Sequence, residues 1–264
     1  AILSKELVTI DRDVPLDIGL DDLALRDHDD EKLKALFVEL EFNTLGQRLF
    51  GDDFLAALQR SLDLNENVEL KSVADVDHDY RLADSTEKQE ELIHLLESID
   101  SFCFDLETTS LNAKTCDIIG LAFSCEPHTG YYVPISENKR EAEKVLERFR
   151  SVLENKKTEK IGHNLKFDCL VLLWNGIHLQ GKIFDTMLAA ALAEPDLNRS
   201  MDFLAQALLG YAPVKITDLI GEKDGETPQK TLREVEPERV AEYAAEDADI
   251  TYQLATELRP KIKE

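Results

Sequence analysis

The sequence has no hydrophobic run that approaches the ~20 residues needed to cross a membrane. Its first residues, Ala1 to Lys5, also lack the long apolar core of a signal peptide. These absences argue against an integral membrane protein. We therefore expect a cytoplasmic protein without a membrane partner.

Closely spaced cysteine pairs are also absent. The four cysteines form no Cys-x-x-Cys pair, and each lies in or beside an apolar segment (Cys103, Cys116, Cys125 and Cys169). A zinc ribbon or a disulfide framework would need such spacing, so neither is indicated. Buried free thiols are the expected state.

Positive charge is scarce: 30 Lys and Arg against 54 Asp and Glu give a net charge of -24. A general basic field that attracts nucleic acid is therefore excluded, and a polyanionic substrate would need local contacts, metal ions or another polypeptide. The hydrophobic fraction of 43% is too high for a disordered chain. The 264 residues suffice for one ordinary domain with an appendage.

One apolar run carries two acids that a buried strand would normally avoid. Residues 101–109 read Ser-Phe-Cys-Phe-Asp-Leu-Glu-Thr-Thr, so strand-compatible side chains flank Asp105 and Glu107. Side chains alternate across a strand, so these two carboxylates point to the same face. Close buried anions repel and need a counter-charge, for which a divalent cation is the usual choice. The run predicts a metal site.

The pair alone does not decide the matter. Asp and Glu make up 54 of 264 residues, so acids two positions apart also arise by chance, as at Asp75 and Asp77. Only the apolar flank separates Asp105 and Glu107 from such pairs.

The pattern of apolar residues along the chain predicts an α/β domain. Residues 101–109, 118–123 and 131–135 are expected to form an antiparallel meander. Further short strands are expected at 78–82, 160–162 and 183–185, which gives a mixed sheet with helices on both faces. Helices are predicted over 32–42, after a cap at Thr86, and over 141–153, 164–174, 186–193, 201–209 and 237–258.

The domain organisation follows from the same pattern. We expect a small, mainly helical appendage over residues 1–50, a linker over 51–66 and the α/β domain over 67–264.

Two further acids are candidates for the site. Asn164 and Asp168 are four residues apart, which on a helix is one face; alternatively, Asn164 caps the helix and Asp168 is a solvated first-turn acid. Tyr243 and Asp247 repeat the spacing on a face that Ile250 and Leu254 continue inward. The neighbouring acids Glu246 and Asp249 are expected to face solvent.

Hard oxygen ligands of this kind suit Mg²⁺ or Mn²⁺. Two such ions about 4 Å apart are the usual arrangement for in-line displacement at phosphorus. The acids therefore indicate phosphodiester hydrolysis.

The ordered acids carry a family resemblance. The set Asp105-x-Glu107, Asn164-x-x-x-Asp168 and Tyr243-x-x-x-Asp247 resembles the three motifs of the DEDD exonuclease superfamily, tyrosine subtype. Residues 105–111, 162–168, 184–187 and 243–249 are similar to the 3′-to-5′ proofreading domain of the bacterial DNA polymerase I family. The resemblance covers about residue 67 to the end, and residues 3–7 and 13–16 resemble the tail of that family's 5′-nuclease domain.

The resemblance implies a ribonuclease H-like fold and a two-metal exonuclease with Mg²⁺, for which Mn²⁺ can substitute. It implies that Asp105, Glu107 and Asp247 hold the first ion, that Asp105 bridges to a second ion with Asp168 acting through its bound waters, and that Tyr243 orients the attacking water. It further implies substrate contacts at Thr108, Leu111, Asn164 and Arg199.

The expected substrate is a single-stranded or frayed DNA 3′ end. The resemblance implies a monomeric piece of a larger, nucleoid-associated bacterial enzyme, whose polymerase domain is absent from this chain. Two alternatives stay open, a ribonuclease D-like RNA exonuclease and an inactive DNA-holding scaffold, because the acids alone do not choose between DNA and RNA.

Overall fold

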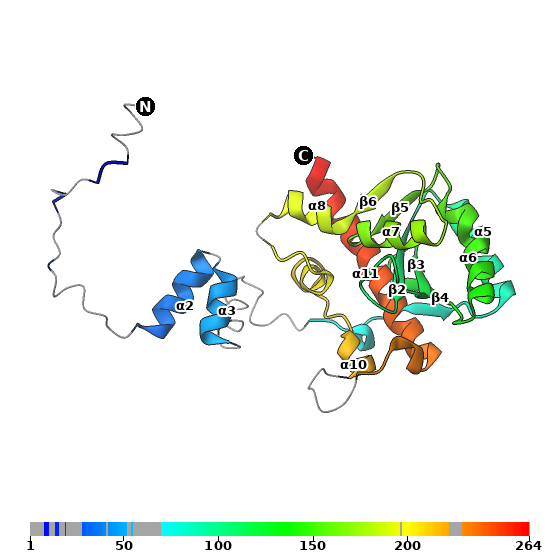
Figure 1. The fold of residues 1–264 in the computed structure, drawn as a ribbon, viewed down its shortest axis with the longest axis horizontal. Coiled ribbons are helices and arrows are strands. Elements are labelled where there is room, and N and C mark those ends of the chain that lie inside the picture. Colours follow the sequence, from blue (N-terminus) through cyan, green and yellow to red (C-terminus); the bar gives the residue numbers. More distant parts are fainter. Residues whose placement is uncertain are drawn as a thin grey trace. The chain divides into compact units, whose positions relative to one another are not determined.

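The structure is a computed structural model that describes residues 8–10, 14–15, 19, 28–40, 42–51, 54, 70–195, 197–221 and 229–263. The chain divides into two compact units, residues 1–67 and 68–264 (Figure 1). Segment 3–7, both ends of segment 13–16 and most of the predicted linker lie outside the described residues.

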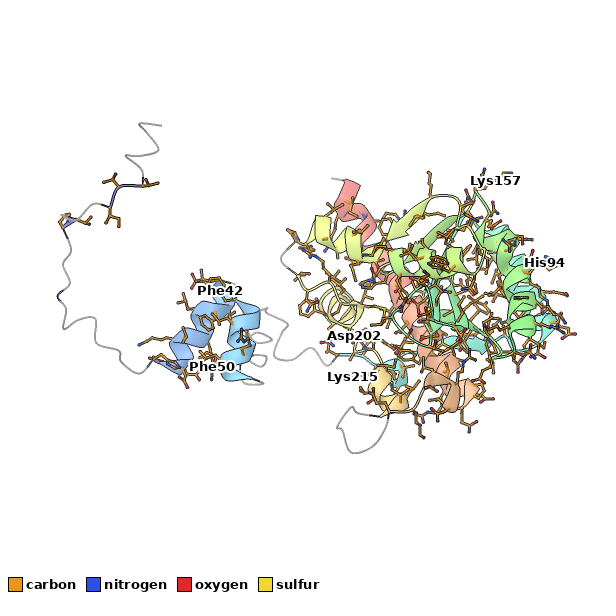
Figure 2. All side chains as sticks on the ribbon, in the orientation of Figure 1. Phe42, Phe50, His94, Lys157, Asp202 and Lys215 are labelled. Carbon is orange, nitrogen blue, oxygen red and sulfur yellow. The ribbon has the colours of Figure 1, made fainter. Side chains whose placement is uncertain are left out.

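The first unit contains two short helices around one aromatic side chain. Helix α2 (Asp30–Glu39) begins after Asp29, whose carboxylate accepts a hydrogen bond from the Lys32 backbone amide at 3.2 Å, and α3 (Asn43–Phe50) follows. The Phe37 ring is buried, with the rings of Phe42 and Phe50 centred 6.1 and 6.2 Å away (Figure 2). Helix α2 ends at Glu39, three residues before the predicted end.

The second unit is built on a six-stranded mixed sheet in the order β1-β4-β3-β2-β5-β6. Strands β2, β3 and β4 form the predicted antiparallel meander, while β1 pairs with β4, β5 with β2 and β6 with β5 in parallel. The strands are β1 (Asp79–Leu82), β2 (Ser101–Thr108), β3 (Ile118–Ser124), β4 (Thr129–Pro134), β5 (Glu159–Gly162) and β6 (Ile183–Asp185). The predicted α/β fold is confirmed.

Alternate residues of β2 enter different cores. Phe102, Phe104 and Leu106 belong to the cluster that α5 (Thr86–Ser98) and α6 (Lys139–Leu153) cover. Cys103, on the opposite face, belongs to the cluster formed with α11 (Pro237–Lys263). In Figure 1, α5 and α6 lie together on one side of the sheet and α11 crosses it. Helices therefore cover both faces, as predicted, and Asp105 and Glu107 share the face of Cys103.

The remaining helices follow the predicted order with shifted bounds. They are α7 (Lys166–Trp174), α8 (Thr186–Ala193), α9 (Met201–Leu204) and α10 (Ile216–Ile220), with single turns η2 (Val73–Asp75), η3 (Ala205–Leu209) and η4 (Leu232–Glu234). The helix expected over 201–209 changes from α to π geometry after Leu204. No helix of the described residues is long and apolar enough to span a bilayer.

Two helix ends differ from the prediction. The cap before α5 is Ser85, whose hydroxyl accepts from the Lys88 amide at 3.3 Å, and Thr86 is the first helical residue. Serine and threonine are both good caps. Ser85 is the cap because its backbone is extended, whereas Thr86 is already helical. Helix α11 continues to Lys263 with Pro260 inside it, beyond the predicted end.

Small residues let α11 lie very close to the sheet. Ala241, Ala244 and Ala248 of α11 are buried against Ala122 of β3. At Gly130 of β4, an added Cβ would stand 2.7 Å from the Ala245 Cβ and its backbone oxygen. Such a distance leaves no room for a methyl group, so the approach of α11 depends on glycine at this point.

We expect Gly130→Ala to destabilise the protein by about 1–3 kcal/mol, because overpacking forces the helix away from β4. Thermal unfolding followed by circular dichroism measures the change. The control is Glu91→Ala on the exposed side of α5, which should stay within about 0.5 kcal/mol of wild type. Equal stability of both variants would contradict the close-packing argument.

Candidate active site

Two of the predicted acids lie where β2 meets β3. Asp105 pairs with Ala122 and Glu107 with Gly120, and the ring of Tyr132 lies over Gly120. The register is irregular between Glu107 and Thr108. The Glu107 side chain is buried and Asp105 is partly exposed. The two carboxylates thus stand side by side on the α11 face of the sheet, near the end of β2.

Helix α11 brings the third acid to the same face. Tyr243 and Asp247 are one turn apart. A hydrogen bond from the Tyr243 hydroxyl partly opposes the rise in the pKa of Asp247. Asp247 is 8% exposed. Among the described residues, its Oδ1 is the one buried side-chain polar atom that has no hydrogen-bond partner. A buried oxygen without a donor is costly, so this atom is a candidate ligand for a cation.

The fourth acid, Asp168, is on α7 and only 4% exposed, so it is not a solvated first-turn acid. The prediction that Asn164 shares its helical face is wrong, because α7 begins at Lys166 and Asn164 has φ of +58°. The backbone amides of Asn164 and Leu165 donate hydrogen bonds to the two carboxylate oxygens of Asp185, at 3.3 and 2.9 Å. A left-handed residue cannot continue a helix, so Asn164 lies in the connection between β5 and α7.

The four carboxylates affect one another electrostatically. Burial raises the pKa of Asp105 to about 6, and burial with the charge of Asp105 raises the pKa of Glu107 to about 8. Burial and Asp105 likewise raise the pKa of Asp168 to about 9. Burial, then the charges of Glu107 and Asp105, raises the pKa of Asp247 far above its usual value. Asp105 is therefore the neighbour that the other three acids share.

The phenol of Tyr243 lies in the same field. Burial, followed by the charges of Asp247 and Glu107, raises its pKa well above the usual value. Tyr243 stays neutral at every relevant pH and can only donate or accept a hydrogen bond.

The side chains as they stand do not form a finished metal site. Within the described ranges, no three His, Cys, Asp or Glu side chains are arranged to hold one ion. The acids are electrostatic neighbours, and ligation would require their carboxylates to turn toward a shared point. The metal site therefore stays a prediction.

The predicted substrate residues lie near the surface. Leu111 is 93% exposed, and Asn164 and Arg199 are also exposed. The Thr108 hydroxyl donates to the Ser110 carbonyl at 3.1 Å, and the Arg199 guanidinium donates to the Pro195 carbonyl at 3.3 Å. Their contacts with substrate stay predictions.

The prediction that Glu246 and Asp249 face solvent is wrong. They are 0% and 1% exposed, and both accept hydrogen bonds from other elements. The sequence carried one signal, the alanines at positions 244, 245 and 248, which are typical of a helix buried on several sides. The partners, Tyr211 and Tyr80, are too distant in the sequence for any local pattern to reveal them.

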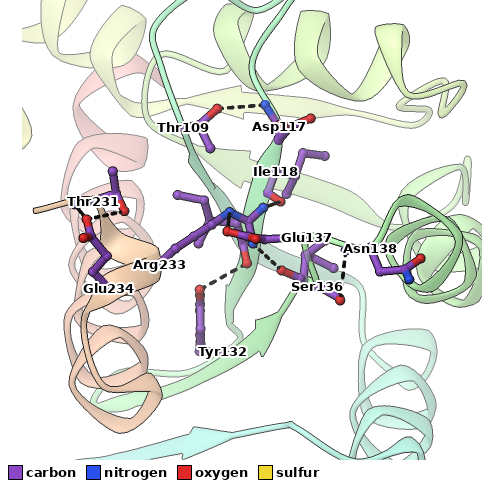
Figure 3. A network of polar contacts seen from close by, with 12 residues as sticks. Thr109, Asp117, Ile118, Tyr132, Ser136, Glu137, Asn138, Thr231, Arg233 and Glu234 are labelled. Atoms are coloured by element: carbon purple, nitrogen blue, oxygen red, sulfur yellow. Dashed lines mark hydrogen bonds and ion pairs between the residues drawn. The ribbon is translucent and has the colours of Figure 1, made fainter.

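An arginine fixes the segment that enters α11. The Arg233 guanidinium donates to the Ile135 and Ile118 carbonyls at 3.0 and 3.2 Å and lies 3.6 Å from the Glu137 carboxylate (Figure 3). Ile118 pairs with Thr108 at the end of β2. Arg233 thus ties the entry of α11 to the strand ends beside the acids.

Solved structures with a similar fold define the fold class. Brucella melitensis NrnC with bound Mg²⁺ is 18% identical with a TM-score of 0.54, covering 71% of this chain and 83% of that one. The catalytic core of RRP6 from Trypanosoma brucei is 17% identical with a TM-score of 0.54, covering 77% and 51%. At such identities the likeness concerns the fold alone, which is the ribonuclease H-like fold.

Sequence comparison specifies the family within this class. A family model described as 3′-5′ exonuclease, of the A-type DNA polymerases, matches residues 80–263. DNA polymerase I of Pseudomonas aeruginosa is 30% identical over 272 residues, covering 100% of this chain and 29% of the relative. The chain belongs to the 3′-5′ exonuclease family of DNA polymerase I enzymes. It spans 29% of the length of that relative.

The raised pKa values predict how stability depends on pH when no divalent cation is present. Unfolded carboxyl groups ionise near pH 4, whereas those of Asp105, Glu107 and Asp168 in the fold have pKa values of about 6, 8 and 9. The folded state therefore binds more protons than the unfolded state in this window, and stability falls as pH rises. We expect a loss on the order of 2 kcal/mol or more between pH 6 and 9, measured by urea unfolding in chelator.

Asp168→Asn should flatten this pH profile and raise stability at pH 9, because one buried charge is removed. Asp202→Asn, at an exposed position labelled in Figure 2, is the matched control and should leave the slope unchanged. A profile that is flat in wild type, or equal slopes in the two variants, would contradict the shared burial of the acids.

Proposed function

We propose that this chain hydrolyses the terminal phosphodiester of single-stranded or frayed DNA 3′ ends, as the proofreading part of a DNA polymerase I. One observation carries the proposal. Burial and the charges of neighbouring acids raise the pKa values of acids from β2, α7 and α11, in a chain that belongs to an exonuclease family. Such a cluster is poorly suited to stabilising a fold and well suited to binding cations.

The donor set fits divalent ions. Asp105, Glu107 and Asp247 would hold one Mg²⁺, to which the Asp247 Oδ1 without a hydrogen-bond partner offers a free lone pair. Asp105 would bridge to a second ion with help from Asp168, and Mn²⁺ would replace Mg²⁺ because both prefer oxygen ligands. When bound, such ions make coordinated water more acidic and offset charge on the departing 3′ oxygen.

The chain's own groups have separate tasks around the scissile bond. The Tyr243 hydroxyl orients the attacking water by a hydrogen bond, a task that needs no change of charge. Glu107 can assist in orienting that water, because its side chain lies on the same face of β2 as Asp105. Burial of these groups strengthens each electrostatic contact with the reacting phosphate.

Substrate binding depends on local contacts because the chain carries a net charge of -24. We propose that Leu111 packs against the terminal bases, with Thr108, Asn164 and Arg199 near the sugar and phosphate. An apolar wedge suits contacts that do not depend on base identity. The proposed setting is the bacterial cytoplasm and nucleoid, with a polymerase domain as the functional partner and the chain as a monomer.

Asp105→Ala should lower exonuclease turnover by roughly 10³-fold, because the acid common to the cluster supplies several kcal/mol of transition-state stabilisation through bound ions. Tyr243→Phe should lower turnover by only about tenfold, the value of one hydrogen bond. Release of 3′ nucleotides from a labelled single-stranded oligodeoxynucleotide in Mg²⁺ measures both.

The same assay should include a matched RNA oligonucleotide and a substrate blocked at its 3′ end. Faster release from RNA would favour the ribonuclease alternative, and no release from either substrate would favour an inactive scaffold. Full activity in Asp105→Ala would refute the proposed site.

Leu111→Ala should raise the KM for single-stranded DNA several-fold while stability stays unchanged, because this side chain is 93% exposed. Leu192→Ala, at a leucine of α8 that is 75% exposed, is the control for loss of a surface leucine. Steady-state kinetics and thermal unfolding give both quantities. Equal KM values for the two variants would remove Leu111 from the substrate path.

A further inference from the structure

A second pair of acids on α11 is buried outside the proposed catalytic cluster. The carboxylate of Glu246 accepts hydrogen bonds from the Tyr211 hydroxyl at 2.5 Å and the Val214 amide at 2.9 Å. Tyr211 and Val214 belong to the segment between η3 and α10. Glu246 therefore ties the middle of α11 to the chain that precedes it.

Asp249 makes comparable hydrogen bonds, one of them to β1 at the edge of the sheet. Its Oδ1 accepts from the His128 amide at 2.8 Å and from the Gln253 side-chain amide at 3.0 Å, and its Oδ2 accepts from the Tyr80 hydroxyl at 2.8 Å. Tyr80 is in β1, and His128, with φ of +62°, lies in the turn before β4. Asp249 thus anchors α11 to β1 and to a left-handed turn.

Each of these partners donates a hydrogen bond, and an ionised carboxylate can accept hydrogen bonds on both of its oxygens. Charge-assisted hydrogen bonds of this kind are stronger and more directional than neutral ones. The two anchors therefore fix the helix in rotation as well as in distance from the sheet.

Asp247 lies between the anchors in the sequence and on another side of the helix. At about 100° per residue, Glu246 and Asp249 are about 60° apart, whereas Tyr243 and Asp247 are about 40° apart on the side toward β2. Turning the helix by about 20° would move a carboxylate some 6 Å from the axis by about 2 Å. Displacements of this size are enough to spoil catalytic geometry.

We propose that Glu246 and Asp249 are positioning residues, which set the rotation of α11 so that Asp247 and Tyr243 face the acids of β2. The inference rests on the proposed function, in which Asp247 is a cation ligand. A purely structural role would also bury these acids, so the test needs readouts that stability alone does not move.

The partner tyrosines offer the least disruptive variants. Tyr211→Phe and Tyr80→Phe each delete one donor and keep the ring, and the double variant deletes both. We expect the affinity for Mn²⁺ alone, measured by electron paramagnetic resonance of the free ion, to fall about 10-fold to 100-fold in the double variant. The kcat on single-stranded DNA should fall by a similar factor, with KM within about twofold.

Leu258→Ala is the matched structural control. Leu258 is fully buried in the same helix, three turns beyond the cluster, and its loss lowers stability without removing an anchor. At a temperature where all variants are folded, Leu258→Ala should keep wild-type Mn²⁺ affinity and kcat. Glu257→Gln, at an exposed acid of α11, controls for charge.

The outcomes separate the two proposals. Mn²⁺ affinity and kcat in the tyrosine variants that match those of Leu258→Ala would overturn the positioning role. If the wild type binds Mn²⁺ but does not cut DNA, the proposed function fails, and the Mn²⁺ comparison alone still decides the positioning role. A wild type that neither binds Mn²⁺ nor cuts DNA would overturn both.

Discussion

The central constraint in this protein is the burial of like charges next to one another. Asp105 sits within the electrostatic range of three other carboxylates, and burial raises the pKa of each. Moving an anion out of water costs several kcal/mol unless a partner of opposite charge offsets this cost. These four acids carry like charges, so none of them offsets the burial cost of another. A fold that tolerates such a cluster must hold it with stability supplied elsewhere.

That stability comes from the packing of α11 and from the apolar core on the other side of the sheet. The alternation of β2 separates the two roles, since Phe102, Phe104 and Leu106 bury against α5 and α6 while the acids face α11. Gly130 and the alanines of α11 let the helix come close enough to carry Asp247 over the strand. The same small side chains that make the approach possible leave little tolerance for substitution.

Much of this arrangement could be predicted from local patterns. The acids of β2 stood out because they interrupt an apolar strand, and period-two alternation placed them on one face. Tyr243 and Asp247 followed from helical spacing. These signals depend on neighbours in the sequence, which is why the strands and most helices were predicted correctly.

The errors occurred where distant residues decide. Asn164 reads as part of a helix, yet its amide is held by Asp185 from another strand end, which stabilises a left-handed conformation. Glu246 and Asp249 read as solvent-facing because charged residues are seldom buried. Donors that are mostly distant in the sequence, such as the hydroxyls of Tyr211 and Tyr80, account for their burial. The choice between Ser85 and Thr86 as a cap was likewise settled by backbone geometry rather than by residue type.

The two kinds of buried acid on α11 differ in their hydrogen bonding, and the contrast bears on function. Glu246 and Asp249 have each oxygen matched by a donor, and these hydrogen bonds offset part of the rise in pKa that burial causes. Asp247, one residue from Glu246, keeps an oxygen with no donor at all among the described residues. If burial of acids on α11 served the fold alone, nothing would favour leaving one oxygen unmatched while its neighbours are fully bonded. The unmatched oxygen is therefore best understood as capacity held for a group outside the chain, and the matched acids as the means by which the helix keeps it in place.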